Sequence, residues 1–373
     1  MVVNICGDFT TIGRGEKAID DRIALDSKIL DLFTKSDLNI VNLESPVASD
    51  LKKGIKKSGP NIHTNSKAIE YLASCNVGLV TLANNHFYDY GRHGIEATVG
   101  ALRKHCIDYV GGGLTSEDVS RIFYFEKNGI NIAILNYCES EFSITEGEGS
   151  NPINPIHVHK DLQEAKKISD FRIVITHGGH EGYNLPSPRM KELYRFFIDS
   201  GANIVCNHHQ HCFSGIENYG GGTIFYGIGN FFFDDFRPVK KRSNIWNSGY
   251  IVSLTIDKKG NAYSIYPYFQ CRQIPTTILM EGQEKKEFEK ELRRLNDIIS
   301  DDIELRRSFD NWCSKKVPIM LPWLSPYSNR LSMALCRRGL LPKFLSDKKK
   351  LQLYNAIRCE SLRDVILNIL KYK

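Results

Sequence analysis

The sequence predicts a layered α/β fold followed by a helical C-terminal extension. Short apolar runs alternate with longer amphipathic ones up to about residue 275, and charged helical sequence follows. Of the 373 residues, 42% are hydrophobic and 25% are charged, which is typical of a globular protein. A chain of this length exceeds the usual single core, so we expect a domain at 1–275 and an extension at 276–373.

The apolar runs define the expected strands, and the amphipathic runs define the helices between them. The strands are expected at Val2–Cys6, Asn39–Leu43, Gly78–Ala83, Asp108–Gly111, Ile130–Asn136, Arg172–His177, Asn203–Asn207 and Thr223–Gly227. The helices are expected at Asp26–Thr34, Ser66–Cys75, Gly91–His105, His159–Ser169 and Pro188–Asp199. This alternation predicts βαβ units and a layered sheet. Residues 250–256 and 262–268 predict a late β-hairpin.

The extension carries the excess positive charge of the chain, and no strand is expected in it. Residues 1–275 hold 29 Lys and Arg against 30 Asp and Glu, whereas 276–373 hold 20 against 13. Its last helices either pack on the body with a solvated basic face or offer a basic amphipathic surface to a membrane or a protein. Aromatic residues do not alternate with the basic ones, so we expect no nucleic acid partner.

The chain is expected in the cytoplasm. Its first residues, "MVVNICGDFTTIG", lack the basic leader and cleavage site of a secretory signal, and no run of about 18 apolar residues predicts a transmembrane helix. The ten cysteines are scattered without CxxC pairs, which favours reduced thiols.

Polar side chains concentrate where the expected strands end. Five of the 11 histidines fall within two windows, "VITHGGHEGY" and "NIVCNHHQHCFSG", and a sixth, His86, follows the third strand in "ANNHFYDYG". A single histidine is most often a solvated or core residue, but six at strand ends together are not explained that way. Imidazole and carboxylate are ligands of Zn²⁺, Mn²⁺ and Fe²⁺, so a metal site is predicted.

The order of these segments resembles the CapA family of capsule or poly-γ-glutamate synthesis proteins. The resemblance rests on "GD" at 7–8, "NLESPV" at 42–47, "LANNHFYDYG" at 82–91, "HGGHEGY" at 177–183, "GANIVCNHHQH" at 201–211 and "GIGNFFFD" at 227–234. It covers roughly residues 1–235. The domain of this family is similar to a divergent calcineurin-like metallophosphoesterase, which implies a β-sandwich flanked by helices.

The resemblance implies two divalent ions, of Mn, Fe or Zn, and a role for each matching residue. The implied metal ligands are Asp8, Glu44, Asn85, His177, His209 and His211. Glu44 would bridge the ions in place of the more usual Asp, and His86 would contact the leaving group. Asp89 either orients His86 or caps the helix expected near Gly91.

This chain departs from the superfamily pattern at two positions. Thr10 stands where a histidine ligand would be, and Gly178 stands where the CapA pattern usually has Trp. His180 and Glu181 could supply a missing ligand or an acid–base group, and His180 could equally be a loop residue. Whether one ion binds or two is left open.

The resemblance implies a metal-dependent hydrolase of phosphoester or related bonds in capsular polymer metabolism. The alternative is a non-catalytic accessory protein of a polymer synthesis or export assembly. An anionic small-molecule or polymer substrate is expected, and the lysines of "DLKKGIKKSG" near Glu44 would suit it unless they form an ordinary solvated loop. Asn230 has two equal interpretations, a site residue or a turn residue.

Overall fold

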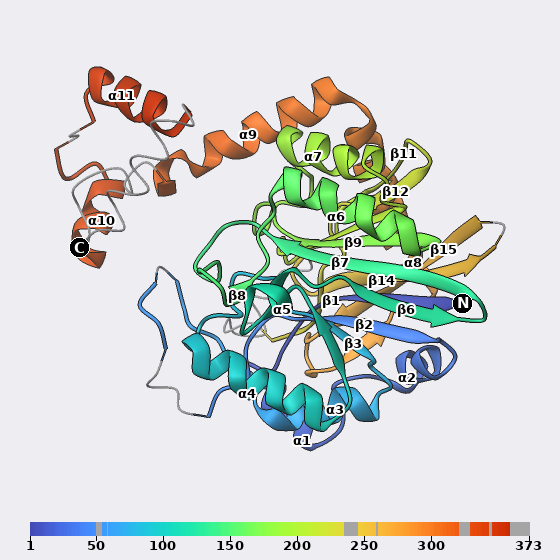
Figure 1. The fold of residues 1–373 in the computed structure, drawn as a ribbon. Coiled ribbons are helices and arrows are strands. Elements are labelled where there is room, and N and C mark those ends of the chain that lie inside the picture. Colours follow the sequence, from blue (N-terminus) through green and yellow to red (C-terminus); the bar gives the residue numbers. More distant parts are fainter. Residues whose placement is uncertain are drawn as a thin grey trace. The chain divides into compact units, whose positions relative to one another are not determined.

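The computed structural model describes residues 1–49, 54–57, 59–234, 245–258, 260–320, 329–342 and 345–358. The chain forms two compact units, Met1–Arg306 and Arg307–Lys373. The first unit contains two large sheets with helices on their outer faces (Figure 1). The predicted layered α/β sandwich with a helical C-terminal extension is therefore confirmed.

The first sheet has the strand order β16-β15-β14-β1-β2-β3-β4, and β13 pairs with β1 beside that path. Its strands are β1 (Val2–Thr10), β2 (Leu38–Leu43), β3 (Leu79–Thr81), β4 (Asp108–Val110), β13 (Asn230–Phe233), β14 (Ser248–Asp257), β15 (Gly260–Gln270) and β16 (Thr277–Leu279). Strands β1 to β4 run parallel, so their carboxyl ends lie at one edge of the sheet.

The second sheet has the order β11-β12-β10-β9-β7-β6. Its strands are β6 (Phe123–Lys127), β7 (Ile130–Cys138), β9 (Phe171–His177), β10 (Ile204–His208), β11 (Ile216–Tyr219) and β12 (Gly222–Phe225). Its parallel strands align Cys138, His177 and His208 in one row at their carboxyl ends. The short strands β5 (Gly112–Gly113) and β8 (Gly149–Ser150) form a separate pair.

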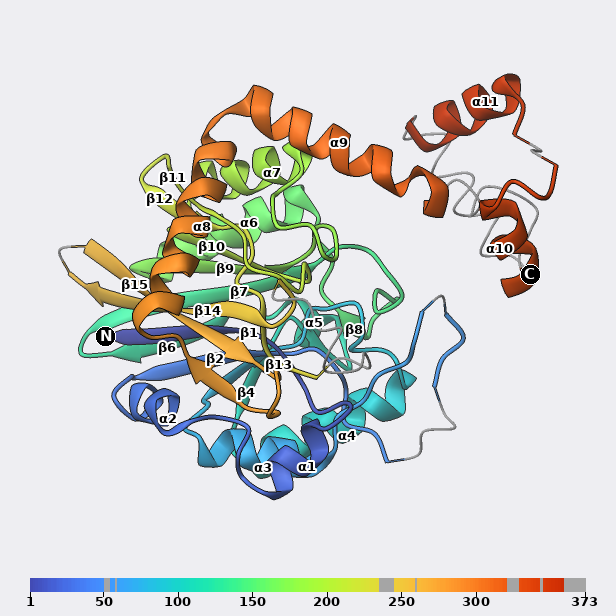
Figure 2. The ribbon, with the colours of Figure 1, turned by 180° about the vertical axis from the view of Figure 1, so that it is seen from behind.

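Helices cover the outer face of each sheet, as the two opposite views show (Figures 1 and 2). The helices beside the first sheet are α1 (Gly15–Asp20), α2 (Ser27–Thr34), α3 (Ser66–Ser74) and α4 (Gly91–Lys104), and α5 (Ser116–Ser120) packs on β4 and β5. Those beside the second sheet are α6 (Pro155–Ile168), α7 (Pro188–Asp199) and α8 (Gly282–Ser300). Side chains of Asp26, Asn65 and Ser187 cap the first turns of α2, α3 and α7, which is why these helices begin where the sequence predicts.

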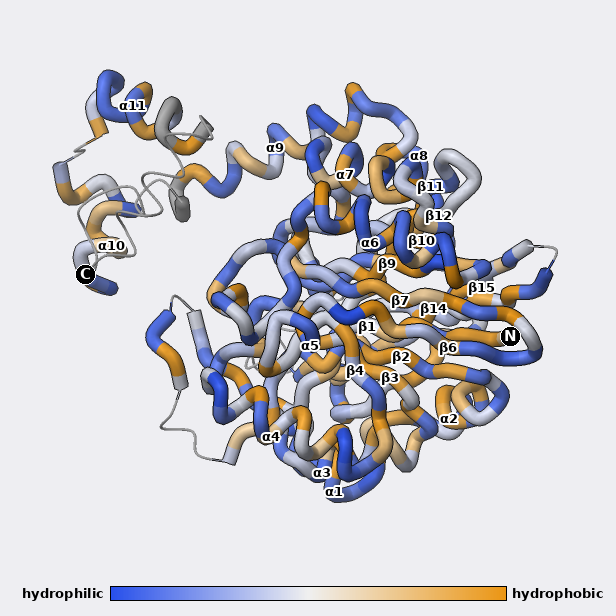
Figure 3. Tube along the Cα trace, viewed as in Figure 1, coloured by the Kyte–Doolittle hydropathy of each residue, from blue (hydrophilic) through white to orange (hydrophobic). Residues whose placement is uncertain are grey.

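Apolar side chains join the layers. Strand β2 is buried along its whole length, and so is most of β9, as expected for parallel strands covered on both faces. The hydropathy colouring shows the same apolar strands at the centre of the unit (Figure 3). Between the sheets, the Phe225 ring on β12 lies 6.4 Å from Tyr250 on β14 and 5.1 Å from Tyr263 on β15. This packing holds the carboxyl ends of the two sheets opposite each other.

Several elements differ from the sequence prediction. The expectation of no strand after residue 276 is wrong, because Thr277–Leu279 forms β16 by pairing with β15. Helix α6 begins at Pro155 rather than His159, because Asn154 caps it and Pro155 suits the first turn. Strands β6, β11 and β13 and helices α1 and α5 were not predicted. Each is short, so its pattern carries little periodic signal.

The C-terminal elements are α9 (Asp302–Met320), α10 (Arg330–Arg337) and α11 (Asp347–Arg358). By its contacts the first unit extends to Arg306 and so includes β16 and α8, whereas the predicted boundary at residue 275 stays a prediction. The described part of the chain contains no helix long and apolar enough to cross a bilayer.

Candidate metal centre

Six side chains meet where the carboxyl ends of the two sheets face each other. Asp8 lies on β1, and Glu44 and Asn85 follow β2 and β3. His177 ends β9, and His209 and His211 follow β10. We call these six residues, Asp8, Glu44, Asn85, His177, His209 and His211, the strand-end cluster. They are the six ligands predicted from the sequence, and the structure brings all of them together.

Four of the six converge on one point, which we call the four-donor position. The His177 Nε2 atom lies 3.0 Å from Asn85 Oδ1, 3.1 Å from His209 Nδ1 and 3.7 Å from Glu44 Oε1. Two imidazole nitrogens, an amide oxygen and a carboxylate oxygen thus face one another within the reach of one cation. Such a mixed set suits a borderline divalent metal ion.

Glu44 also belongs to a second group, which we call the three-donor position. The His211 Nε2 atom lies 3.5 Å from Glu44 Oε1, and the His211 Nδ1 atom lies 3.4 Å from Asp8 Oδ2. The ligand atoms of Asp8, Glu44 and His211 all lie within 4.8 Å of one another. A carboxylate shared by two adjacent groups is the arrangement expected of a residue that bridges two ions.

The residues present fit a bound cation. Neither carboxylate oxygen of Glu44 has a hydrogen-bond partner among the described residues, although the side chain is fully buried. Burial and the neighbouring Asp8 carboxylate raise the pKa of Glu44 well above its usual value. An unpaired buried carboxylate is unfavourable unless a cation compensates it. A metal ion would supply that compensation.

The buried imidazoles and carboxylates also shift the pKa values of one another. Burial alone would raise the pKa of Asp8, but its hydrogen bond with His211 and the nearby His177 lower it below the usual range. Burial lowers the pKa of His209 to about 4, with a further contribution from His211. Burial and His209 hold the pKa of His177 well below its usual value. His177 and His209 are therefore neutral at pH 7, the form that binds metal.

Two asparagines orient the ligands of the three-donor position. Asn42 donates a hydrogen bond of 2.7 Å to Asp8 Oδ1. Asn230 Oδ1 lies 2.8 Å from His211 Nδ1, so that Nδ1 can donate to it while Nε2 faces Glu44. A hydrogen bond on the far nitrogen commonly fixes the tautomer of a metal-binding histidine. Asn230 therefore belongs to the site, and Asn42 was missed because an asparagine inside an apolar strand gives no specific signal.

The His-x-His turn has an unusual backbone. His209 and His211 have positive φ angles of 80° and 55°. Residues other than glycine enter this region at a cost of roughly 1–3 kcal/mol each, and such residues cluster at functional sites. Gln210 holds the turn, because its backbone oxygen accepts from Gly182 N and its side-chain amide donates to the carbonyl of Tyr183.

His86 and Asp89 form a buried pair beside the cluster. His86 Nδ1 lies 2.7 Å from Asp89 Oδ2, which leaves Nε2 as the free nitrogen of the ring. Asp89 also accepts from Ile62 N and is paired with Lys57. Helix α4 has Tyr90 as its N-cap and no side-chain cap, so Asp89 orients His86 and does not cap the helix.

The sequence predicts that Lys57 lies either in an ordinary solvated loop or near the mouth of the predicted site, where it would suit an anionic substrate. Its side chain is only 3% exposed, and its Nζ atom contacts both Asp89 and His86 Nδ1, the latter at 3.1 Å. No local sequence pattern indicates this burial, because His86 and Asp89 lie 29 and 32 residues further along the chain. The other lysines of that segment that precede Gly54 lie outside the described residues.

Thr10, which stands where the superfamily pattern has a histidine ligand, has a structural role in this chain. Its hydroxyl lies 2.7 Å from Ser45 Oγ and 3.5 Å from Thr64 Oγ1, and all three side chains are buried. Thr10 is thus part of a hydroxyl cluster.

His208 is one of the five histidines in the two windows but is not among the implied ligands, and it forms a possible ligand group with Asp8 and His177. Burial lowers the pKa of its ring, against the smaller raising effects of Asp8 and of the Cys6 carbonyl. Neither ring nitrogen reaches hydrogen-bonding geometry with a described residue.

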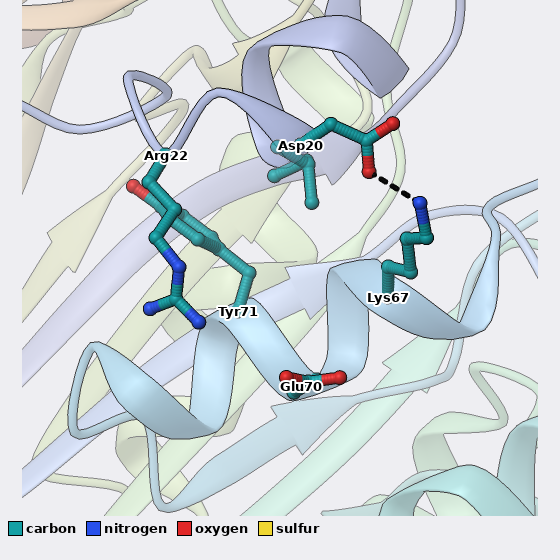
Figure 4. A pocket seen from close by; sticks show the side chains of 6 residues that line it. Asp20, Arg22, Lys67, Glu70 and Tyr71 are labelled. Atoms are coloured by element: carbon teal, nitrogen blue, oxygen red, sulfur yellow. Dashed lines mark hydrogen bonds and ion pairs between the residues drawn. The ribbon is translucent and has the colours of Figure 1, made fainter.

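A separate hollow of about 230 Å³ lies between α1 and α3, away from the strand ends (Figure 4). Its lining residues are Ile19, Asp20, Arg22, Lys67, Glu70 and Tyr71. Lys67 and Asp20 pair across it at 2.8 Å, which occupies two of its charged groups. The hollow contributes no residue to the strand-end cluster.

The sequence profile of "Bacterial capsule synthesis protein PGA_cap" matches residues 2–235, which contain the whole strand-end cluster. The chain belongs to this family. The PGA_cap chain is 33% identical over 247 residues to the capsule biosynthesis protein CapA of Bacillus anthracis, covering 63% of this chain and 60% of that one. It is 35% identical over 210 residues to the PGA biosynthesis protein CapA of Bacillus subtilis (strain 168), covering 54% and 55%. The matches thus span less than two thirds of either relative.

Among solved structures, a 5'-nucleotidase from Candida albicans SC5314 superposes with a TM-score of 0.44 and 12% identity. The superposition covers 84% of the PGA_cap chain and 57% of the nucleotidase. At this TM-score the likeness supports no conclusion, and the description of the site rests on the chain's own geometry.

Proposed function

We propose that the strand-end cluster binds two divalent metal ions, of Mn, Fe or Zn, and hydrolyses a phosphoester or related bond. The observation that carries this proposal is Glu44, which is buried, has no hydrogen-bond partner for either oxygen among the described residues and is shared by the two donor groups. When bound, a pair of ions supplies Lewis-acid activation of water and of a phosphoryl oxygen. The protein supplies the positions of the ions and the proton donor.

His86 is the proton donor in this proposal. Its Nδ1–H donates to Asp89, so Nε2 can donate to the departing oxygen when the ring is protonated; burial lowers the pKa of His86, and the Asp89 carboxylate acts against that by favouring the protonated form. The ring is 12% exposed, which makes it the more accessible partner of the pair, since Asp89 is fully buried. Lys57 and the amide of Ile62 fix the Asp89 carboxylate and thereby the orientation of His86.

The test is metal analysis and turnover with the full-length chain. We expect the wild type to bind divalent metal and to hydrolyse a generic aryl phosphodiester with added Mn²⁺, and we expect His209→Ala to lose turnover. His93→Ala is the matched control, because His93 is 72% exposed on α4 and outside the cluster. Equal turnover of the wild type and His209→Ala would contradict a hydrolytic role.

The second candidate function is a non-catalytic accessory role in a capsular polymer assembly. It is favoured by the three-donor position, where Thr10 is engaged elsewhere and the protein supplies fewer ligands. Bound metal without turnover of any phosphoester would support this candidate over the hydrolase.

We propose that either activity serves capsule or poly-γ-glutamate biosynthesis, with an anionic polymer or small molecule as the substrate. Support comes from the family and from the names of the two CapA relatives. We also propose a cytoplasmic location, which is supported by free thiols at described cysteines such as Cys6, Cys138 and Cys206. Cell fractionation tests the location, and a strain lacking the protein tests the polymer.

We propose that the C-terminal helices contact an anionic membrane surface. In the described part of this region, Leu331 on α10 and Leu351 and Ile357 on α11 are 71%, 69% and 59% exposed, close in sequence to several exposed Arg and Lys. Apolar and basic residues on the same helices are typical of interfacial binding. Co-sedimentation with phosphatidylserine vesicles, but not with phosphatidylcholine vesicles, is the expected result. Binding to neither kind of vesicle, or equal binding to both kinds, would contradict this proposal.

A further inference from the structure

The two positions of the strand-end cluster differ in the number of protein ligands. The four-donor position has Glu44, Asn85, His177 and His209, whereas the three-donor position has Asp8, Glu44 and His211. Thr10 does not complete the second set, because its hydroxyl is held by Ser45. The three-donor position therefore has room for one more ligand.

Glu181 is a further carboxylate close to this position. One of its carboxylate oxygens lies within 4.8 Å of ligand nitrogens of both His209 and His211. The residue is exposed, whereas both histidines are buried, so its carboxylate approaches the cluster from the solvent side. Glu181 also raises the pKa of Glu44 and of His211, as expected for a carboxylate close to both.

The loop that carries Glu181 is fastened to the His-x-His turn itself. Gly182 N donates to the Gln210 carbonyl at 2.8 Å, and Gln210 Nε2 donates to the carbonyls of Tyr183 and Leu185 at 2.7 and 3.0 Å. Gly182 has a φ of 71°, which a glycine adopts readily and which lets the loop turn sharply after Glu181. The carboxylate is thus held near the histidines by the residue between them.

Two other side chains near the cluster fit the three-donor position less well. His208 forms a ligand group with Asp8 and His177, and that group does not include Glu44 or His211. Glu141 lies 3.6 Å from His209 Nε2, so it is near the position that already has four donors. Glu181 is grouped with His209 and His211, and of these His211 is a donor of the three-donor position, which has room for a further ligand.

We propose that Glu181 is the fourth protein ligand of the ion held by Asp8, Glu44 and His211. This inference rests on the proposed binding of metal to the cluster. The Glu181 carboxylate, on a loop that follows β9 of the second sheet, would take the place of the histidine that is missing at position 10 of the first sheet. A carboxylate in place of an imidazole also makes this ion's environment harder and more oxygen-rich, which favours Mn²⁺ over Zn²⁺ there.

The experiment compares Glu181→Gln with Glu96→Gln in the full-length chain. Both variants replace one exposed carboxylate by an amide, but Glu96 lies on α4 and outside the cluster, so only Glu181→Gln removes the proposed ligand. Bound Mn²⁺ is counted after equilibrium dialysis, and Co²⁺ titrations followed by visible absorption report the coordination of each ion. Changing even a residue that only supports a ligand lowers metal affinity by about 10–100-fold. We therefore expect Glu181→Gln to lower the affinity for one of the two ions by at least about tenfold.

The control variant Glu96→Gln should keep both ions and the wild-type Co²⁺ spectrum. Equal metal stoichiometry, affinity and spectrum in the two variants would overturn the inference while leaving the proposed function intact. A wild-type chain that binds no Mn²⁺ or Co²⁺ would overturn the proposed function itself. Glu181 is exposed, so the variant should fold, and a thermal melt matching that of the wild type checks this.

Discussion

The two sheets contribute different chemistry to the same site. The first sheet supplies oxygen donors, Asp8, Glu44 and Asn85, whereas the second supplies the imidazoles of His177, His209 and His211. Within each sheet, neighbouring groups of the same kind disfavour the charged form of one another. Asp8 adds to the effect of burial in raising the pKa of Glu44, and His209 adds to the effect of burial in lowering the pKa of His177. Across the sheets they stabilise one another, because Glu44 and Asp8 raise the pKa of His211 to about 10 despite its burial.

This comparison shows that neither sheet forms the site alone. The first sheet presents oxygen donors and the second presents imidazoles. Only when the sheets pack together do the carboxylates lie beside the imidazoles, where each favours the charged form of the other. Glu44 is the link, because it takes part in both donor groups.

The largest expected effect therefore follows from changing Glu44, the link between the sheets. We expect Glu44→Gln to lose both ions and to lower Mn²⁺-dependent turnover by at least about 100-fold, at or beyond the upper range for disturbed metal sites. Metal content and initial rates measure this. Glu96→Gln on α4, which is 46% exposed, is the control. Retention of both ions in Glu44→Gln would show that the sheets bind metal separately.

The next largest effect concerns the proton donor on the first sheet. Lys57→Met leaves the fully buried Asp89 carboxylate without its cationic partner, so we expect the free energy of unfolding to fall by about 3–5 kcal/mol. Urea denaturation measures the loss. The double variant Lys57→Met, Asp89→Asn should recover much of it, because no unpaired charge stays buried. A single variant as stable as the wild type would show that the pair contributes little.

A smaller effect is expected where the first sheet orients a ligand of the second. Asn230 on β13 lies 2.8 Å from His211 Nδ1, so Asn230→Ala should free the ring. We expect metal affinity to fall by about 10–100-fold with the fold preserved. Isothermal titration with Mn²⁺ measures this, and unchanged affinity would mean that packing alone orients His211.

The smallest effect is expected for a surface ion pair on α8, outside the strand-end cluster. Arg294 on α8 pairs with Glu291, and their side chains are 56% and 39% exposed. Such surface pairs contribute about 0–1 kcal/mol, so Arg294→Ala should leave metal binding unchanged and shift the free energy of unfolding by less than about 1 kcal/mol. A larger loss of stability in a thermal melt would show that α8 supports the sheets more than its packing indicates.

The sequence by itself determined most of the strands and helices and the polar positions after the strands, and the resemblance to the CapA family implied the six residues of the strand-end cluster. Buried parallel strands are apolar along their length, helix starts carry caps such as Asp26 and Asn65, and polar residues after such strands stand out against them. These are local patterns, so they can be read without knowing which strands pair.

Only the tertiary structure decided which of these residues meet and what surrounds them. Lys57 looks like a loop residue until Asp89 and His86 enclose it, and Thr10 looks like a missing ligand until Ser45 and Thr64 bind it. Strand β16 exists only because β15 lies beside it. Each depends on contacts between residues distant in sequence, and the free energy of such contacts comes from burial and pairing that no local pattern records.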